Sequence, residues 1–432
     1  MTRSRHPMGG PTGDRVLKPS ILTIMLAGGA GERLHPLTNE IAKPAVPFGG
    51  GYRIIDITLS NCINSGLRQI YILTQHKALT LNRHIRQAWN ILSPEVGEII
   101  EILPPTRRVS ENWYLGTADA VFQNARTIEI SNPRSTLILA ADHVYKMNYQ
   151  AMFNWHVAHR ADVTVGTTQV TPAETKRFGV VEIGEDYRIT GFEEKPQHDS
   201  PARSRFNAAM CSVSMGIYLF STRVLLEALR QDHECVSSTR DFGRDVLPRL
   251  VGEGQAVFAY DFVDENNRGS PYWRDIGTLD AYYEANMDLV SVAPVFNLYD
   301  EAWPLRTYQP QYPPAKFVFA EEGRRMGVGV NSMVCSGCIV SGGRVMNSIL
   351  SAGVRVNSFS EIESSILFHD VNVGRHSRLR RVIVDTGIQL EERTEIGLDP
   401  EEDRRRGHFI TEAGVVIVHS GSPGVVRRDA DP

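Results

Sequence analysis

A six-residue spacing of apolar residues constrains the C-terminal part of this chain more than any other feature. From residue 328 to residue 396 apolar side chains recur in steps of six, with small slips. Such spacing is typical of a parallel β-helix, in which each coil has three six-residue sides and the apolar residue of each side points inward. Ordinary strand alternation would produce some of these matches, but several phased series favour the coil. The residues in phase are Val328, Val334, Val340, Met346, Val356, Ile362, Phe368, Val373, Leu379, Val384, Leu390 and Ile396.

The N-terminal part has a different pattern, in which apolar runs alternate with helical spacing between residue 21 and about residue 291. This alternation predicts an α/β fold with a largely parallel sheet. Ligands in such folds bind at the carboxyl ends of the strands. The predicted strands include 21–27, 69–75, 135–143, 161–170 and 214–221, and the predicted helices include 53–66 and 149–161.

Four segments follow from these patterns. Residues 294–316 contain Pro304, Pro310, Pro313 and Pro314, too many for a regular element, and we interpret them as a linker. Residues beyond Ser420 have no predicted element. The segments are a disordered basic arm over 1–20, a catalytic domain over 21–293, the linker over 294–316, and the coil domain with its C-terminal tail over 317–432.

Composition excludes several functions. The formal net charge of −4 gives no basic surface for nucleic acid, so we expect no nucleic-acid partner. No apolar run reaches the length of a membrane span, and the N-terminal arm lacks the apolar centre of a signal peptide. Five cysteines are too few for a disulfide framework and suggest a reducing cytoplasm. Cys335 and Cys338 resemble half a zinc site, but without a second pair we favour packed thiols.

A glycine-rich loop follows the first predicted strand. In "MLAGGAGERLHPLTNEIAKPAVPF" three glycines follow the apolar run, and Arg33 and Lys43 come after them. Backbone N–H groups of such a loop can approach phosphate oxygens, and the two cations can neutralise them. The spacing fits neither a Walker loop nor a dinucleotide fingerprint. A tight strand-to-helix turn with solvated charges is the simpler alternative.

Two acids stand at the ends of apolar or aromatic stretches. Asp142 ends "STLILAAD", and Asp275 lies in "YWRDIGTLDAYYEAN" before a predicted helix. Each alone could be a helix cap. Together with the phosphate loop they form the set that nucleotidyl transfer needs, in which carboxylates and substrate phosphates hold Mg²⁺. Neither Lys195 in "GFEEKP" nor Tyr114 in "ENWYLGTADA" decides anything by itself. Residue type alone favours a solvated lysine, and adjacent aromatics before a glycine can be core, a stacking platform or both.

The order of these motifs carries more information than any one of them. "LAGGAGERLHPLT", "ENWYLGTADAV", "FEEKP", "SMGIYLF" and "YWRDIGTLDAYYEANMDL" resemble, in order, the ADP-glucose pyrophosphorylases (glucose-1-phosphate adenylyltransferases) of bacterial glycogen synthesis. The resemblance extends from about residue 21 to residue 396. It implies a Rossmann-like nucleotidyltransferase domain followed by a left-handed parallel β-helix. It also implies the reaction of ATP with α-D-glucose 1-phosphate to give ADP-glucose and pyrophosphate, with Mg²⁺, as the first committed step of glycogen synthesis.

The resemblance also implies roles for the residues of the loop. The backbone of Gly28, Gly29 and Gly31 would cradle the phosphates of ATP. Arg33 would hold the leaving β- and γ-phosphates, and Lys43 would bridge phosphates near the reacting centre.

Further residues match other positions of the family. Asp142 and Asp275 would bind the metal. Lys195 would pair with the phosphate of glucose 1-phosphate, and Glu194 would bind sugar hydroxyls. The remaining matches are Gln75 and Tyr114 near the nucleotide, and Tyr114, Gly179 and Ser214 near the sugar phosphate.

The regulatory positions depart from the enteric pattern. Glu40 stands where those members carry a cation, and Thr386 stands where they carry an arginine that contacts AMP, although Arg53 is retained. We therefore expect phosphorylated metabolites as effectors of a homotetramer, with weak activation by fructose 1,6-bisphosphate and weak inhibition by AMP.

Two alternatives remain open. A non-catalytic regulatory paralogue would share this fold, although the charged residues it would lose are present here. The other alternative is a different sugar-1-phosphate nucleotidylyltransferase, with or without acyltransferase activity. The acyltransferase would need a catalytic histidine on the coil. His369 and His376 are available for that role, but we expect both on solvated corners.

Overall fold

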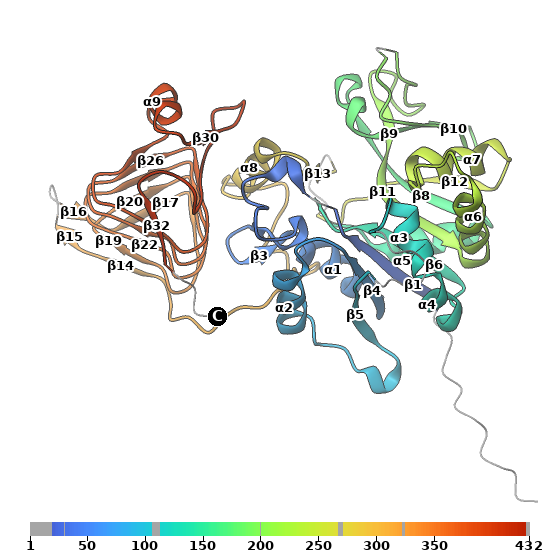
Figure 1. Ribbon diagram of the computed structural model, residues 1–432, viewed down its shortest axis with the longest axis horizontal. Helices are drawn as coiled ribbons and strands as arrows, with labels where there is room; N and C mark the ends of the chain where they lie inside the picture. The colour runs from blue at the N-terminus through green and yellow to red at the C-terminus, as the bar shows by residue number, and fades with distance from the viewer. Residues whose placement is uncertain are drawn as a thin grey trace, which may run out of the picture.

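The computed structural model describes residues 20–29, 31–105, 113–198, 200–266, 271–321 and 325–428. An N-terminal α/β body and a C-terminal body of short stacked strands lie side by side (Figure 1). The predicted N-terminal arm lies outside the described residues, except for Ser20. None of the described helices is long and apolar enough to cross a membrane.

A nine-stranded sheet forms the centre of the N-terminal body, in the order β10-β9-β11-β6-β1-β4-β5, with β8 joining β11 to β12. β1 runs parallel to β4 and β6, so that Met25 lies opposite Ile72 and Leu139, whereas β11 runs antiparallel to β6 and β8. The predicted parallel core is thus confirmed. The strands are β1 Ile21–Ala27, β4 Gln69–Thr74, β5 Ile99–Leu103, β6 Ser135–Ala140, β8 Val163–Val170, β9 Gly179–Ile183, β10 Ile189–Glu194, β11 Cys211–Ser221 and β12 Val257–Asp261.

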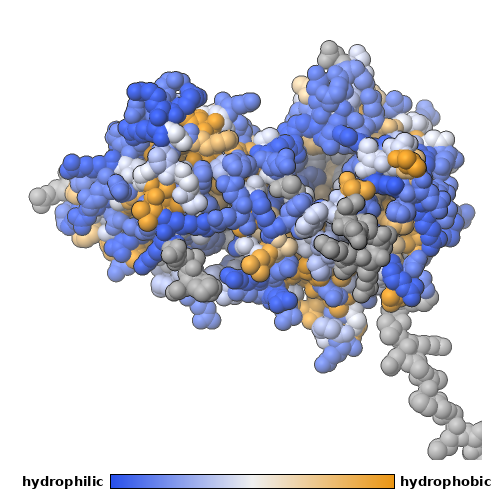
Figure 2. Space-filling view, viewed as in Figure 1, coloured by the Kyte–Doolittle hydropathy of each residue, from blue (hydrophilic) through white to orange (hydrophobic). Residues whose placement is uncertain are grey.

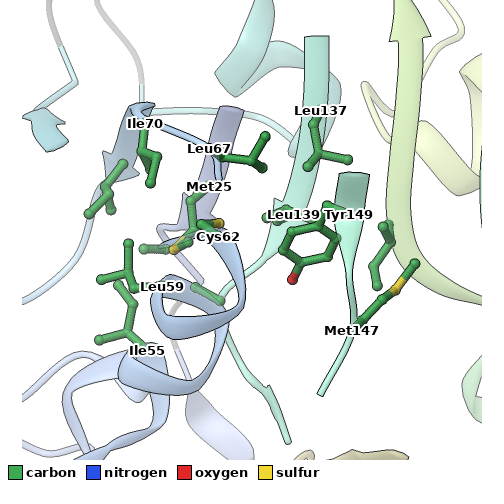
Figure 3. Packing of buried hydrophobic residues seen from close by; sticks show 14 of the residues in the cluster. Met25, Ile55, Leu59, Cys62, Leu67, Ile70, Leu137, Leu139, Met147 and Tyr149 are labelled. Carbon is green, nitrogen blue, oxygen red and sulfur yellow. The ribbon is translucent and has the colours of Figure 1, made fainter. Parts of the chain in front are cut away.

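Helices cover both faces of this sheet because its central strands are apolar on both faces. Successive residues of β1 point to opposite sides, so Met25 packs in one buried cluster and Ile24 in another. Figure 3 shows the first cluster, where Ile55, Leu59 and Cys62 of one helix lie against the sheet. On this face lie α1 Ile54–Asn64, α2 Ala78–Ala88 and α5 Tyr149–Ala158; on the other lie α3 Thr117–Gln123, α4 Ala125–Ser131, α6 Thr222–Glu234 and α7 Leu247–Gly252.

Short elements gather where the parallel strands end. A two-stranded ribbon pairs residues 143–145 with residues 273–275. Three-residue helical turns follow β1 and the loop beyond it. These elements are η1 Glu32–Leu34, η2 Lys43–Ala45, β2 Pro47–Phe48, β3 Tyr52–Arg53, β7 His143–Tyr145, η4 Pro172–Arg177, η5 Phe242–Val246, β13 Trp273–Asp275 and α8 Leu279–Asp288, with η3 Pro94–Val96 at the far side of β4.

The C-terminal body is a coil of three sheets whose strands are almost all parallel, consistent with the β-helix that the spacing predicts. The first sheet contains β14 Lys316–Val318, β19 Ile339–Ser341, β22 Arg355–Val356, β25 Asn372–Val373, β28 Ile388–Leu390 and β32 Val425–Arg427. The second contains β17 Val328–Val330, β20 Arg344–Met346, β23 Glu361–Glu363, β26 Arg378–Arg380 and β29 Glu395–Ile396. The third contains β18 Met333–Val334, β21 Ile349–Leu350, β24 Ile366–Leu367, β27 Val382–Val384, β31 Val416–Val418 and β30 Phe409–Ile410. A hairpin, β15 Ala320–Glu321 with β16 Arg325–Met326, and the helix α9 Pro400–Arg405 project from the coil.

The later coils repeat every 17 residues rather than every 18, as the register Val345, Ile362, Leu379 and Ile396 shows, and the first coil is 16 residues long. Each coil is therefore one or two residues short of three full sides, which explains the slips in the six-residue pattern. Three predicted inward residues are wrong for this reason. Val328 is in register with Arg344 and Glu361, which are exposed, so Gly329 takes the inward position. Val345 rather than Met346 is buried in the coil interior, and Leu367 points inward while Phe368 packs against the α/β body.

The chain between α8 and β14 forms no helix or strand, yet it is anchored along α1. The indole of Trp303 donates to Asn61 at 2.8 Å, and the Thr307 hydroxyl donates to the carboxylate of Asp56 at 2.7 Å. Asp56 is fully buried and also accepts from Trp89. The stretch that includes the predicted linker is thus fixed to the α/β body by hydrogen bonds.

The two bodies share one apolar cluster. Ile349, Ile366 and Phe368 of the coil pack with residues of η1, α1 and α8. The Tyr283 hydroxyl of α8 donates to the Ser364 carbonyl at 2.6 Å. The C-terminal tail adds to this contact. It forms β32, where no element was predicted, which pairs with β28 of the coil and brings Arg427 to Glu40 of the α/β body at 2.7 Å.

Candidate active site

The glycine-rich loop opens at the carboxyl end of β1, as predicted. Gly31 has a φ of 69°, in the left-handed region that favours glycine, and it precedes η1. A Cβ at Gly31 would lie 3.1 Å from the Cβ of Lys43, and a Cβ at Gly28 would lie 3.1 Å from the Cβ of Gln75. The Thr38 hydroxyl donates to the Gly31 carbonyl at 2.9 Å. The loop therefore turns back on η2 and brings Lys43 beside the strand ends.

Lys43 and the predicted metal acids meet at this edge of the sheet. The Lys43 ammonium donates to the Asp142 carboxylate at 2.7 Å. Asp142 follows β6, and Asp275 reaches the same point because β13 pairs with β7. His143 Nε2 lies 3.6 Å from Asp142 and 3.7 Å from Asp275, between the two carboxylates.

This cluster fits a divalent cation. Ligand atoms of Asp142, His143 and Asp275 all lie within 4.8 Å of one another. His143 Nδ1 is buried without a hydrogen-bond partner, so one polar atom of the cluster is unsatisfied. Two carboxylates are the donors that hard divalent cations prefer.

The surrounding charges keep Asp142 ionised. Burial alone would raise its pKa, but the Lys43 ammonium, His143 and Arg33 together hold the pKa of Asp142 well below its ordinary value. An ionised carboxylate at neutral pH is the form that binds a metal.

A cavity of about 430 Å³ opens next to Asp142 and collects the predicted nucleotide residues. The phenol of Tyr114 accepts a hydrogen bond from Asn124 at 3.2 Å. Arg33 and Gly31 lie beside the cavity but do not line it. The predicted residues that line it are Gly28, Gly29, Lys43, Gln75, Tyr114 and Asp142.

The predicted sugar-phosphate residues form a second group beyond this cavity. The Lys195 ammonium lies 2.9 Å from the Glu194 carboxylate at the end of β10. Glu194 fits between two glycines, because a Cβ at Gly179 would lie 2.7 Å from its Oε2 and a Cβ at Gly243 2.5 Å from it. The Ser214 hydroxyl on β11 donates to Tyr218 at 3.3 Å.

The predicted regulatory residues lie elsewhere, in a second cavity of about 430 Å³ between the two bodies. Glu40, Arg53 and Thr386 all line it, although they come from both bodies. The Arg427 guanidinium of β32 pairs with Glu40 at 2.7 Å. The tail therefore supplies a cation at the position where the sequence suggested that cations had been lost.

The histidines and cysteines of the coil show no second catalytic centre among the described residues. His376 is exposed and stacks on Phe359. His369 lines the cavity between the bodies, so its expected place on a solvated corner is wrong. Cys335 and Cys338 are free thiols, and burial raises the pKa of Cys338 to about 12.

Comparison with known proteins agrees with this geometry. Residues 22–292 match the nucleotidyl transferase family, and residues 313–418 match the GlmU-like C-terminal hexapeptide family. A glucose-1-phosphate adenylyltransferase of Koribacter versatilis is 59% identical over 398 residues, covering 92% of this chain and 94% of the relative. Proteins of the same name from Rhodopirellula baltica and Methylococcus capsulatus are 52% and 48% identical, over 95% and 92% of this chain and 93% and 92% of their own lengths. The chain belongs to the glucose-1-phosphate adenylyltransferase family.

Three ionisable residues at the site were not predicted from the sequence. His143 directly follows Asp142, and the "ADH" sequence could have suggested it. Asp241 lines the nucleotide cavity and accepts from the Thr117 hydroxyl at 3.0 Å. Arg177 donates to Asp275 at 2.9 Å. No local motif marks the last two, because only the fold brings them to the strand ends.

Proposed function

We propose that this protein transfers the adenylyl group of ATP to α-D-glucose 1-phosphate, releasing pyrophosphate and forming ADP-glucose for glycogen synthesis. The observation that carries the proposal is the meeting of Lys43, Asp142 and Asp275 at the opening of the glycine-rich loop. An oxygen of the sugar phosphate attacks the α-phosphorus, and pyrophosphate leaves in line. No covalent intermediate with the protein is required, so the residues act by positioning and by charge.

The residues divide this work between the two substrates. The backbone of Gly28 and Gly29 and the ammonium of Lys43 bind the nucleotide phosphates in the cavity. Lys195 binds the phosphate of the sugar, and Glu194, which its neighbours hold in place, binds sugar hydroxyls.

We infer that Asp142 and Asp275 hold Mg²⁺. Oxygen donors combined with substrate phosphates are the usual ligands of this ion, which supplies charge neutralisation at the reacting phosphates. The Lys43 ammonium, which donates to Asp142 at 2.7 Å, offsets part of this negative charge.

The test of the proposed function is pyrophosphate release by the purified protein with ATP, UTP, GTP, CTP or dTTP in the presence of glucose 1-phosphate. We expect release with ATP well above release with the others. Equal or greater release with UTP or dTTP would assign the protein to another nucleotidylyltransferase activity. Acetyl-coenzyme A turnover, measured on the same sample, would support the acyltransferase alternative.

We further propose that four copies assemble. Large apolar side chains are exposed at the first coil, and hydrophobic patches interrupt the hydrophilic surface of the coil domain (Figure 2). Light scattering is expected to give four times the mass of one chain, and a monomer at working concentration would contradict the proposal. The exposed residues are Phe317, Phe319, Met326 and Val330.

We propose that the cavity between the two bodies binds phosphorylated effectors. It contains the guanidinium groups of Arg53 and Arg427, but Glu40 and Asp385 stand among them. This balance suits an anion of low charge better than a bisphosphate. A cytoplasmic location stays a prediction.

A further inference from the structure

Arg177 is a charged residue at the site for which the proposed function has not yet given a role. It ends η4, directly before Phe178 and β9, and its side chain is 40% exposed. Its Nη2 donates to Oδ2 of Asp275 at 2.9 Å. The guanidinium also lies 5.5 Å from the centre of the Phe178 ring. The contact with the ring and the ion pair aim the guanidinium at the proposed metal acids.

Arg177 and Arg33 converge on one point of the backbone, at Gly277. A Cβ at Gly277 would lie 3.2 Å from Nη2 of Arg177 and 3.4 Å from Nη1 of Arg33, and only 2.8 Å from Oδ2 of Asp275. The absence of a side chain at this position thus lets two guanidinium groups approach one carboxylate. Arg33 makes no hydrogen bond or ion pair with any residue in the described part of the chain. Two neighbouring guanidinium groups with one carboxylate between them leave positive charge uncompensated.

We propose that Arg177 is a second pyrophosphate-binding residue that acts together with Arg33, and that it rests on Asp275 until this carboxylate binds a divalent cation. The inference rests on the proposed function, since it places the leaving group of that reaction. A guanidinium presents planar pairs of N–H donors that match two phosphate oxygens. When the Asp275 carboxylate binds a divalent cation, Arg177 loses its only carboxylate partner in the described chain. Its guanidinium is then free to bind the phosphates beside Arg33.

The charges around the site agree with this exchange. Three cations, Arg33, Lys43 and Arg177, face the two carboxylates of Asp142 and Asp275, so the cluster carries about one net positive charge. A divalent cation on the two carboxylates makes the cluster strongly positive. The β- and γ-phosphates of a nucleoside triphosphate, and later free pyrophosphate, supply the compensating negative charge.

A purely structural ion pair predicts different behaviour. If Arg177 only holds Asp275 in position, its removal weakens metal binding, because the carboxylate loses its orientation. If Arg177 instead competes with the cation, its removal strengthens metal binding to the substrate-free protein. Metal affinity therefore changes in opposite directions under the two hypotheses.

The experiment compares Arg177→Gln and Arg177→Lys with a matched control. Arg274→Gln is the control because Arg274 lies on β13, the strand that also carries Asp275. Its side chain has a similar exposure, 47%, and it pairs with Asp288 of α8 at 3.2 Å. Mn²⁺ binding to the substrate-free protein is measured by electron paramagnetic resonance. Pyrophosphate binding in the presence of Mg²⁺ is measured by isothermal titration calorimetry.

For Arg177→Gln we expect pyrophosphate affinity to fall about 10- to 100-fold, as for the loss of a charge-assisted hydrogen-bonded pair. We expect Mn²⁺ affinity to rise several-fold. Arg177→Lys keeps the positive charge but lacks the planar pair of N–H donors of a guanidinium. It should therefore keep wild-type Mn²⁺ affinity and recover only part of the pyrophosphate affinity. Arg274→Gln should change neither quantity.

Unchanged pyrophosphate affinity in Arg177→Gln, or a parallel fall of Mn²⁺ and pyrophosphate affinity, would overturn the inference. Both measurements use binding rather than turnover, so they are separable from the proposed function. A wild-type protein that releases pyrophosphate from ATP while Arg177→Gln binds it normally would refute only the role of Arg177. A wild-type protein that binds pyrophosphate but converts no sugar phosphate would refute only the proposed function.

Discussion

The Lys43 ammonium and the Asp142 carboxylate lie 2.7 Å apart, and the proposed function requires both groups in their charged forms. Asp142→Asn removes the negative charge with which Asp142 would hold the proposed metal, a contribution made mainly in the transition state. We expect kcat to fall by about 10³-fold while the protein stays folded. Initial rates and circular dichroism measure the two quantities. A variant with near-normal kcat would refute the metal assignment of Asp142.

Lys195 is about half exposed and has one ion-pair partner, Glu194. Its proposed contact with the sugar phosphate exists in the ground state as well as in the transition state, so its loss raises KM more than it lowers kcat. For Lys195→Gln we expect KM for glucose 1-phosphate to rise about 10- to 100-fold, with KM for ATP nearly unchanged. Steady-state kinetics with each substrate varied in turn make the comparison. Equal damage to both KM values would indicate a structural role.

At the scale of elements, the 17-residue repeat of the coil predicts which side chains carry its stability. Leu379 is buried in the coil interior, whereas Met346 is only half-buried. Leu379→Ala should lower the free energy of unfolding by about 2–5 kcal/mol because it leaves a cavity. Met346→Ala should lower it by about 1 kcal/mol or less. Urea denaturation of both variants tests the register. A larger loss of unfolding free energy in Met346→Ala than in Leu379→Ala would show that Met346 points into the coil, as the six-residue spacing predicted.

The contact between α5 and β8 predicts a pH dependence of stability. His156 is buried and bonds to the Thr164 hydroxyl at 2.8 Å, and burial lowers the pKa of His156 to about 4 from an ordinary value of 6.5. Between pH 6.5 and pH 4 the unfolded chain therefore binds a proton that the folded protein does not. The stability that this neutral histidine contributes is complete above pH 6.5 and is lost as the pH falls, by about 3 kcal/mol in total.

Denaturant unfolding at pH 7.5 and pH 5 measures this effect. His156→Gln should flatten the loss of stability between these two pH values. The matched control is His376→Gln, at an exposed histidine of the coil, which should leave the wild-type slope in place. The same slope in His156→Gln and wild type would assign the pH dependence to other groups.

At the scale of the whole molecule, the cavity between the two bodies predicts how the enzyme is regulated. Glu40 of the α/β body pairs with Arg427 of the tail, so this guanidinium is not free for an effector. Wild-type protein should therefore respond weakly to fructose 1,6-bisphosphate and more strongly to a monophosphate such as fructose 6-phosphate. Glu40→Gln should release Arg427 and increase the sensitivity to the bisphosphate several-fold, and Glu40→Lys should increase it too.

Titration with both effectors at subsaturating ATP makes this comparison. Glu95→Gln, at an exposed acid of η3, is the matched control and should change nothing. AMP is expected to inhibit weakly, since the Thr386 hydroxyl cannot replace a guanidinium. Strong activation of the wild type by fructose 1,6-bisphosphate would contradict this prediction. It would show that the positive charges of Arg53 and Arg427 outweigh the repulsion between Glu40 and the bisphosphate.

The sequence by itself determined the elements and the local motifs. The predicted strand 69–75 is β4 to within one residue, and α1 and α5 begin within one residue of their predictions, because apolar periodicity depends only on neighbouring residues. The loop from Gly28 to Lys43 could be predicted as a unit for the same reason. The six-residue spacing indicated the coil, although the shortened side of each coil shifted Met346 and Phe368 out of phase.

Only the tertiary structure decided which charges meet. Arg177 and Asp275 are 98 residues apart, and Glu40 and Arg427 are 387 apart, so no local pattern relates them. Their contacts depend on the pairing of β7 with β13 and of β28 with β32, which packing of the whole chain determines. Phe368 points away from the coil for a related reason, because the α/β body covers that face and makes both sides of its strand apolar. The spacing of apolar residues predicts that a residue is buried. Which residues bury it depends on contacts between segments that are distant in the sequence.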